Sequence, residues 1–153
     1  MTAHSASSTV ASDSPGHVSA FMILRLFLGL RTLIAGLEKF EANKSFSFSN
    51  YYENMNRLAT GISSASVLPV WATKSFAMPL GYVLIALGLA ILLGLKTRIA
   101  LCVTGLVYVG LSFGLMAVQE GEGVAWIGMQ ILMFAFALTL VRHDRFALLA
   151  DKN

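Results

Sequence analysis

Three stretches of this chain contain neither a charged residue nor a histidine, and each is 18 to 20 residues long: 76–95, 99–118 and 124–141. A fourth run, residues 18–37, has the same length but contains Arg25 and Arg31. About 20 apolar helical residues, at a rise of about 1.5 Å each, cross the hydrocarbon core of a bilayer. The alternation typical of barrel strands is absent, and hydrocarbon admits only helices and closed barrels. The chain is therefore predicted to cross a membrane four times as helices.

Short connections leave little of the chain outside these helices. Residues 96–98 join the second and third runs, residues 119–123 join the third and fourth, and residues 38–75 form one long loop. Only 12% of the residues are charged, against about 25% in soluble domains. We predict an all-α membrane protein, an antiparallel four-transmembrane-helix bundle. The bundle occupies residues 18–146, between a disordered N-terminal tail (1–17) and a short C-terminal tail (147–153).

The distribution of lysine and arginine predicts how the bundle is oriented. These residues are enriched in cytoplasmic loops close to span ends. With the N-terminus inside, five of them lie on the cytoplasmic side and four on the opposite side: Lys96, Arg98, Arg142, Arg145 and Lys152 against Lys39, Lys44, Arg57 and Lys74. The pairs at 96/98 and 142/145 also lie directly beside span ends. We predict that both termini are cytoplasmic and that residues 40–75 are outside.

The long outer loop contains one further helical pattern. Apolar residues recur at three- and four-residue spacing between Phe48 and Ile62. Asn50 with Glu53 three residues later resembles a capping box, and Gly61 is a typical helix stop. The pattern predicts a short amphipathic helix of about three turns in the outer interface. It would serve either as a cap on the bundle or as a lid over a lateral entrance.

The first helix carries ionisable residues on two faces. One face is lined by Arg25, Gly29, Thr32, Gly36 and Lys39, and a second by Arg31, Ala35 and Glu38. Charged residues at membrane depth are costly and usually face protein, a cavity or a ligand. Two central arginines cost about 5–7 kcal/mol for insertion, which roughly offsets the apolar gain of the whole helix. Both arginines are therefore expected to point into protein, toward different neighbours.

The partner of Arg25 is an open question at this level. Of the eight acidic residues, only Glu38 lies at the margin of a span, two turns beyond Arg31. We therefore expect no carboxylate of the same chain at the depth of Arg25. Backbone carbonyls and hydroxyls, a ligand, or an acid of a partner subunit remain as its three candidate partners.

Other polar residues in the spans could assist, but no catalytic or metal site is predicted. Tyr82, Tyr108 and Gln130 can hydrogen-bond a quinone carbonyl or a neighbouring helix. The three histidines lie outside the spans, so no haem-binding pair forms, and no Cys/His/carboxylate cluster has metal spacing. The basic residues are scattered around helix ends, which argues against nucleic-acid binding.

Two motifs resemble a known family. LRLFLGLRTLIAGLEKF (24–40) resembles the opening helix of DoxX/DoxD-type membrane proteins, and GLAILLGLKTRIA (88–100) resembles the exit of their second helix. The likeness covers residues 20–146 and looks closest to the DoxD-like branch, similar to the small subunit of thiosulfate:quinone oxidoreductase. Many relatives carry a glutamate early in helix two, where this chain has Gly81 and Tyr82. If that acid balances the helix-one arginine, Arg25 needs another partner here.

The resemblance implies an integral subunit of a bacterial or archaeal plasma membrane. The subunit would not be catalytic alone: it would position quinone or anchor a protein partner that carries the redox centre. The residues expected to bind quinone or the partner are Arg25, Arg31, Glu38, Lys39, Tyr82, Tyr108 and Gln130. Two alternatives stay open, a structural anchor or assembly factor without ligand chemistry, and a small transporter. No inverted repeat or broken helix supports the transporter.

Overall fold

A computed structural model describes residues 15–42 and 44–144. Its four long helices are α1 (Pro15–Leu37), α3 (Val70–Leu93), α4 (Thr97–Ala117) and α5 (Gly121–Leu140). Between α1 and α3 lie the 3₁₀ turn η1 (Glu38–Phe40), the two-residue antiparallel strands β1 (Glu41–Ala42) and β2 (Ser45–Phe46), and helix α2 (Phe48–Ala65). A second 3₁₀ turn, η2 (Val141–His143), follows α5. All four long helices have the length and hydropathy of membrane spans, so the predicted all-α four-helix architecture is confirmed.

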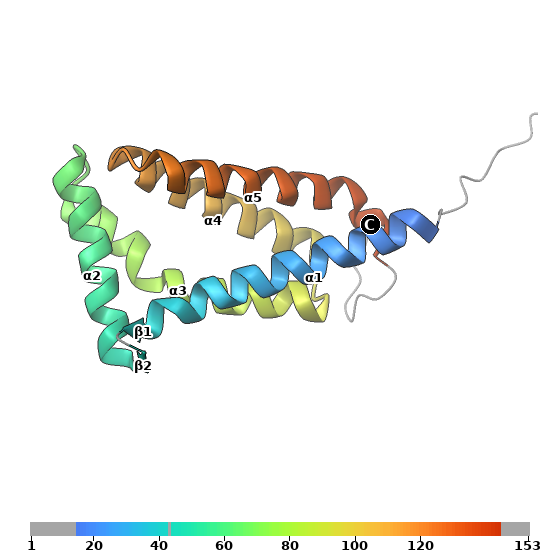
Figure 1. Cartoon of the computed structure of the whole chain (residues 1–153), viewed down its shortest axis with the longest axis horizontal. Helices are drawn as coiled ribbons and strands as arrows, with labels where there is room; N and C mark the ends of the chain where they lie inside the picture. The colour runs from blue at the N-terminus through green and yellow to red at the C-terminus, as the bar shows by residue number, and fades with distance from the viewer. Residues whose placement is uncertain (1–14, 43, 145–153) are drawn as a thin grey trace, which may run out of the picture.

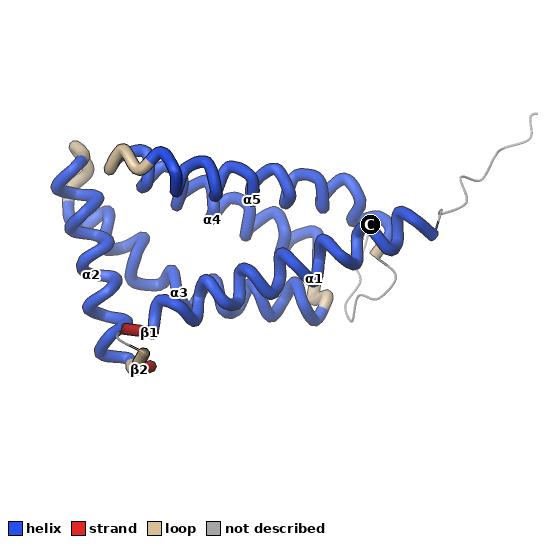
Figure 2. Tube along the Cα trace, in the orientation of Figure 1, coloured by secondary structure: helices blue, strands red, loops and turns tan. Residues whose placement is uncertain are grey.

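The four long helices form two closely packed pairs. Helix α1 packs along α3, and α4 packs along α5. Figure 1 shows that the two pairs approach each other at the end where η2 and the start of α1 lie, and diverge toward the opposite end. Helix α2 crosses that open end, and the tube in Figure 2 shows how little loop connects these elements. The bundle is therefore closed at one end by its own helices and capped at the other by α2.

Two predicted boundaries were wrong. Helix α3 begins at Val70, six residues before the predicted start, because its first turns include Thr73, Lys74 and Ser75 and so escape a search for uncharged runs. Helix α1 begins at Pro15, so residues 15–17 are helical and not part of a tail. The remainder of the predicted N-terminal tail and the C-terminal tail at 147–153 lie outside the described residues.

Helix α2 is longer than predicted, and its ends differ from the predicted ones. It has 18 residues, about five turns instead of three. Its N-cap is Ser47, whose hydroxyl accepts a hydrogen bond from the backbone N–H of Asn50 at 3.1 Å, so the proposed Asn50–Glu53 capping box was wrong. Gly61 does not end the helix, because Ile62 in the next position packs against Gly114 of α4. Tertiary contact thus extends the helix past its local stop signal.

Glycines allow α1 and α3 to approach each other closely. A Cβ atom built on Gly88 of α3 would lie 2.6 Å from the backbone nitrogen of Leu33, and one on Gly36 of α1 would lie 2.9 Å from the carbonyl oxygen of Gly81. Such distances leave no space for a side chain. The two glycines therefore set the separation of these helices, as small residues do in many membrane bundles.

Tyr51 ties α2 to a weak point in α3. Pro79 lies inside α3 and cannot donate a backbone hydrogen bond. The fully buried phenol of Tyr51 donates to the carbonyl of Met78 and accepts from the N–H of Gly81 at 3.3 Å. Burial raises the pKa of the Tyr51 phenol, which keeps its donating proton in place. The first half of α2 is thereby fixed to the bundle where α3 bends (Figure 1).

Replacing Gly88 by alanine tests the close approach of α1 and α3. The added Cβ would collide with the Leu33 backbone, and overpacking of this kind typically costs about 1–3 kcal/mol. We expect a lower midpoint of thermal unfolding in detergent. Gly128→Ala in α5 is the matched control, because no atom of the described chain lies within 4 Å of its built Cβ. Equal midpoints for the two variants would contradict the close contact.

Cysteine labelling tests the predicted orientation without changing a lysine or arginine. His17 and Ser49 are exposed at opposite ends of the bundle. In a Cys102→Ala background, Ser49→Cys should react with an impermeant maleimide in intact cells, and His17→Cys only after permeabilisation. The reverse pattern would show that the termini are outside.

Candidate functional site

Arg25 forms a cap on the C-terminal end of α3. Its Nε donates to the carbonyl of Ile91 at 2.8 Å and its Nη2 to the carbonyl of Leu92 at 3.0 Å. The last carbonyls of a helix have no partner within the helix and carry the negative end of its dipole. The helix ends at Gly94, which adopts the left-handed conformation with φ of 70°. A guanidinium, with donors in a planar fork, satisfies two of these carbonyls at once.

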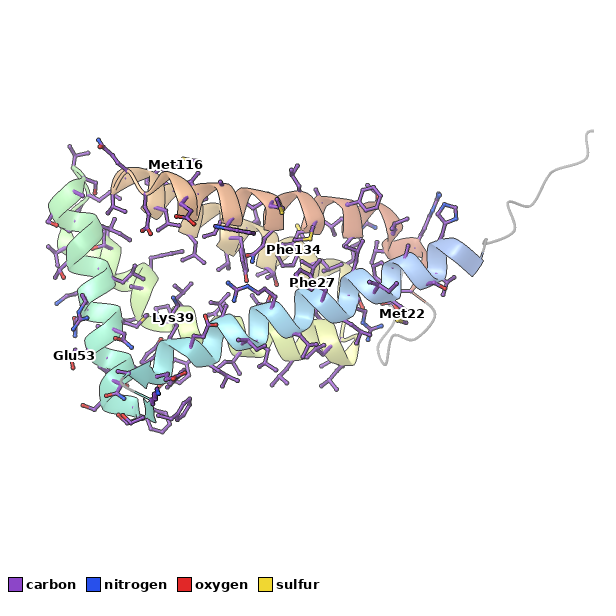
Figure 3. All side chains as sticks on the ribbon, in the orientation of Figure 1. Met22, Phe27, Lys39, Glu53, Met116 and Phe134 are labelled. Carbon is purple, nitrogen blue, oxygen red and sulfur yellow. The ribbon has the colours of Figure 1, made fainter. Side chains whose placement is uncertain are left out.

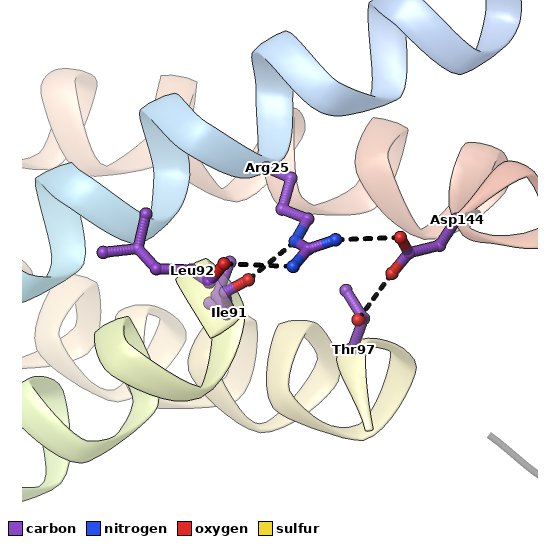
Figure 4. A network of polar contacts seen from close by, with 5 residues as sticks. All are labelled: Arg25, Ile91, Leu92, Thr97 and Asp144. Carbon is purple, nitrogen blue, oxygen red and sulfur yellow. Dashed lines mark hydrogen bonds and ion pairs between the residues drawn. The ribbon is translucent and has the colours of Figure 1, made fainter. Parts of the chain in front are cut away.

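The third nitrogen of the Arg25 guanidinium binds a carboxylate of the same chain, contrary to our expectation. Its Nη1 lies 2.9 Å from Oδ1 of Asp144, and both side chains are about 95% buried. The other oxygen of Asp144 accepts a hydrogen bond from the hydroxyl of Thr97 at 2.6 Å. Figure 4 shows this Arg25–Asp144 network connecting α1, the end of α3, the start of α4 and the segment after α5. Asp144 thus balances the charge of Arg25 in this chain.

The position of Arg25 explains why Asp144 can reach it. Helix α1 starts at Pro15, and Figure 1 shows its first turns extending past the ends of the other long helices. Arg25, ten residues into α1, therefore lies level with the α3–α4 turn and not in the middle of the bundle. Arg31, six residues further along, lies about 9 Å deeper.

A cavity of about 740 Å³ lies between the diverging helix pairs, beneath α2. Most of its wall is apolar and comes from α2, α3 and α4, including Met55, Leu58, Phe76, Leu84 and Leu111. Its size falls within the range of about 300–1,000 Å³ that is typical of small-molecule sites. The cavity therefore suits a ligand that is largely apolar.

Polar residues from every long element also line the cavity. The predicted candidates among them are Arg31 of α1, Glu38 and Lys39 of η1, Tyr108 of α4 and Gln130 of α5, and the others are Asn54 and Arg57 of α2, Thr73 of α3 and Glu120 before α5. Arg31 and Glu38 form a loose ion pair with N–O distance 3.8 Å, and both side chains stay about half exposed. Figure 3 shows Lys39 inside the angle between α1 and the α4–α5 pair, whereas Glu53 projects from the outer side of α2. Since the ion pair is open, Arg31 retains donors for a ligand.

The hydroxyl of Tyr108 has no hydrogen-bond partner among the described residues, although the residue is only 3% exposed. Its ring packs against Phe134 with centroids 5.3 Å apart. Thr104, Tyr108 and Ser112, which recur every four residues, are all buried on the inner face of α4. Buried polar groups are normally hydrogen-bonded, so an unpartnered hydroxyl beside a cavity indicates a place for a ligand or water oxygen.

Five of the seven candidate residues thus share one cavity, and two do not line it. Arg25 takes part in the Arg25–Asp144 network. Tyr82 lies in an aromatic cluster with Phe40 and Tyr51, at centroid distances of 5.4 and 4.9 Å, which holds η1 and α2 on α3. Sequence reasoning missed Asp144 and Thr97. Both are polar residues next to predicted span ends, on the same side of the bundle as Arg25, and this proximity was the available signal.

Among residues 15–42 and 44–144, no group of three His, Cys, Asp or Glu side chains has a metal-binding arrangement. Cys102 is exposed on α4. The polar groups on the cavity wall offer hydrogen bonding and charge, from three cations, two carboxylates, two amides, a phenol and a threonine hydroxyl.

Removing one partner of the Arg25–Asp144 pair should destabilise the bundle strongly. Arg25→Leu leaves Asp144 buried without its cation, and breaking a buried pair in this way typically costs about 3–5 kcal/mol. The double variant Arg25→Leu/Asp144→Leu should recover much of the loss, because no buried charge remains. Thermal unfolding in detergent measures both effects.

Arg57→Leu is the matched control, because Arg57 pairs with Glu53 at 3.3 Å on the exposed face of α2. Exposed pairs contribute about 0–1 kcal/mol. A loss in Arg25→Leu no larger than in Arg57→Leu would mean that the network does not hold the bundle together.

Comparison with known proteins agrees with this architecture. A family model described as DoxX matches residues 20–117, from within α1 to the last residue of α4, and so covers more than half of the 153 residues. No curated protein and no solved structure matches the chain. Asp144 lies beyond the matched region, so the match does not include the counter-ion of Arg25. On its matched motifs and its four apolar helices, the chain belongs to the DoxX family of membrane proteins.

Proposed function

We propose that this protein is the membrane subunit of a quinone-linked oxidoreductase complex and binds quinone in the cavity beneath α2. One observation carries the proposal: an apolar cavity of about 740 Å³ collects Arg31, Lys39, Tyr108 and Gln130 on its wall. A quinone has the matching chemistry, since its ring oxygens accept hydrogen bonds and its tail is apolar. The DoxD-like motifs in α1 and α3 support the same assignment.

The residues present fit such a ligand. Arg31 and Lys39 donate hydrogen bonds and carry positive charge, and the amide of Gln130 donates and accepts. The neutral Tyr108 hydroxyl can do either, and it lacks a partner among the described residues. Apolar side chains from α2, α3 and α4 surround these groups and would exclude water from the ring. Convergent polar groups in an apolar cavity are the usual composition of a cofactor site.

The electrons are proposed to come from a partner subunit. Quinone, when bound, would supply the electron-accepting chemistry, while this chain binds and orients it. The sequence offers no pair of histidines within its spans for haem and no cluster of metal ligands. The cap formed by α2 and the β1–β2 hairpin is, in the predicted orientation, the face presented to an external redox partner.

A structural anchor is the second candidate, and the Arg25–Asp144 network favours it. Arg25, the more deeply buried arginine, serves contacts within the chain. If Arg31 and Glu38 had a similar role, the chain would need no ligand. Ligand binding by the purified chain separates the two functions directly.

A quinone-binding measurement tests the proposal. The purified chain in nanodiscs should bind a short-tail benzoquinone, measured by equilibrium partition against empty nanodiscs. Arg31→Leu should weaken binding by about tenfold or more, since a hydrogen bond from a charged group contributes about 1.5–3 kcal/mol. Lys74→Leu is the matched control, because Lys74 is exposed and does not line the cavity. Equal partition into protein-containing and empty nanodiscs would leave the anchor as the function.

The same preparation tests the division of labour. The isolated chain should show no donor-dependent quinone reduction, and reduction should appear only when its copurifying partner is added. Reduction by the chain alone would contradict the proposed role.

A further inference from the structure

Two buried hydroxyl groups, those of Thr32 and Tyr108, interact with each other and have no further hydrogen-bond partner among the described residues. Thr32 is fully buried, and Tyr108 is 3% exposed. Other buried threonines contrast with them. Thr104, one turn before Tyr108 on α4, donates to the carbonyl of Ala100 at 2.6 Å, and Thr97 donates to Asp144. The lack of a partner is therefore confined to a single location between α1 and α4.

The two hydroxyls lie next to each other at the cavity wall. Thr32 of α1 is a side-chain neighbour of the Tyr108 phenol, and the charges of Arg31 and Glu38 are within electrostatic range of it. Tyr108 lines the cavity, whereas Thr32 does not. Tyr108 therefore lies between the cavity and Thr32. An oxygen atom of a ligand in the cavity would complete the hydrogen bonding of Tyr108, with Thr32 behind it.

We propose that Tyr108 binds a ring oxygen of the quinone and that Thr32 is its positioning residue, so that the pair accommodates both the oxidised and the reduced ligand. This inference rests on the proposed function. A hydroxyl can donate one hydrogen bond and accept others. Facing a carbonyl oxygen, Tyr108 donates to the ligand and accepts from Thr32. Facing a ring hydroxyl, Tyr108 accepts from the ligand and donates to Thr32.

The arrangement makes an asymmetric prediction for Thr32. In Thr32→Val, Tyr108 can still donate to a carbonyl, so binding of the oxidised ligand should change less than threefold. When a ring hydroxyl of the reduced ligand donates to Tyr108, the Tyr108 hydroxyl needs Thr32 as the acceptor of its own proton. Thr32→Val removes this acceptor, and a buried donor without a partner is costly in free energy. Binding of the reduced ligand should therefore weaken about tenfold. Thr32→Ser keeps the hydroxyl and should restore both affinities.

The experiment measures the affinity of the chain in nanodiscs for a short-tail benzoquinone and for its hydroquinone, the latter under anaerobic conditions with excess reductant. Tyr108→Phe should weaken both by about tenfold, while its unfolding midpoint without ligand should fall no more than that of Thr32→Val, because among the described residues the two hydroxyls have only each other as partner. Thr104→Val is the matched control. It removes a buried hydroxyl from the same face of α4, but this hydroxyl already donates to the carbonyl of Ala100 within the helix. Its affinities should equal those of the unmodified chain.

The outcomes separate the two proposals. If the unmodified chain binds neither form, the proposed function and this inference both fail. If it binds quinone and Arg31→Leu weakens binding, but Tyr108→Phe and Thr32→Val behave like Thr104→Val, the function stands and the inference is overturned. Equal losses of the oxidised and reduced forms in Thr32→Val would overturn the positioning role of Thr32.

Discussion

The buried Arg25–Asp144 pair is the interaction on which the rest of the bundle depends. It combines two side-chain charges with two helix ends: the guanidinium meets the negative C-terminal end of α3, and the carboxylate lies at the positive N-terminal end of α4. A buried ion pair stabilises a fold only when its further hydrogen-bonding capacity is used. Here the carbonyls of Ile91 and Leu92 and the hydroxyl of Thr97 complete it. The network joins segments that are 119 residues apart in the chain.

The two arginines of α1 have different environments because their side chains lie on different faces of the helix. Arg25 faces helix ends that have fixed acceptors, and its side chain is about 95% buried. Arg31 faces the cavity and forms a loose ion pair with Glu38, at an N–O distance of 3.8 Å. The closed end of the bundle is therefore held by an arginine that binds two helix carbonyls and a carboxylate of the same chain. The arginine that faces the cavity keeps donors beyond its loose ion pair. One helix thus supplies both the buried ion pair that supports the bundle and a charged group on the cavity wall.

The architecture could be predicted from the sequence because membrane spans depend on local composition. Uncharged runs identified three helices, and the length of the run around Arg25 and Arg31 identified the fourth. The spacing of Arg31 and Glu38 also predicted a common face of the first helix, and both residues line the cavity. Lys39, which the spacing placed on the face of Arg25, lines the same cavity. The role of Asp144 could not be predicted in this way, because it depends on how far α1 extends past its neighbours. The lengths of α2 and α3 likewise depend on tertiary contacts, such as Ile62 against Gly114.

The departure of Tyr82 from the predicted site has a similar origin. The sequence correctly located Tyr82 near the outer end of α3, one residue after Gly81. It did not predict the direction in which the Tyr82 side chain points. Phe40 and Tyr51 pack against its ring and hold it in the aromatic cluster. Which face of a uniformly apolar helix meets its neighbours is not encoded in that helix alone. Helix α3 is apolar on nearly every side, so the residues that pack against it decide which of its faces is buried.

The convergence of the two helix pairs at one end gives the cavity a mechanical property. Helices of 20 residues are about 30 Å long, so a rotation of one pair by about 5° around the Arg25–Asp144 network would move its far end by roughly 3 Å. In such a rotation the helix ends near the Arg25–Asp144 network would hardly move. The width of the cavity between the diverging ends would change most. Helix α2 is attached to α3 through Tyr51 and touches α4 through Ile62, so it spans the widening gap as a tie. The stiffness of α2 would therefore limit how far such a rotation could widen the cavity.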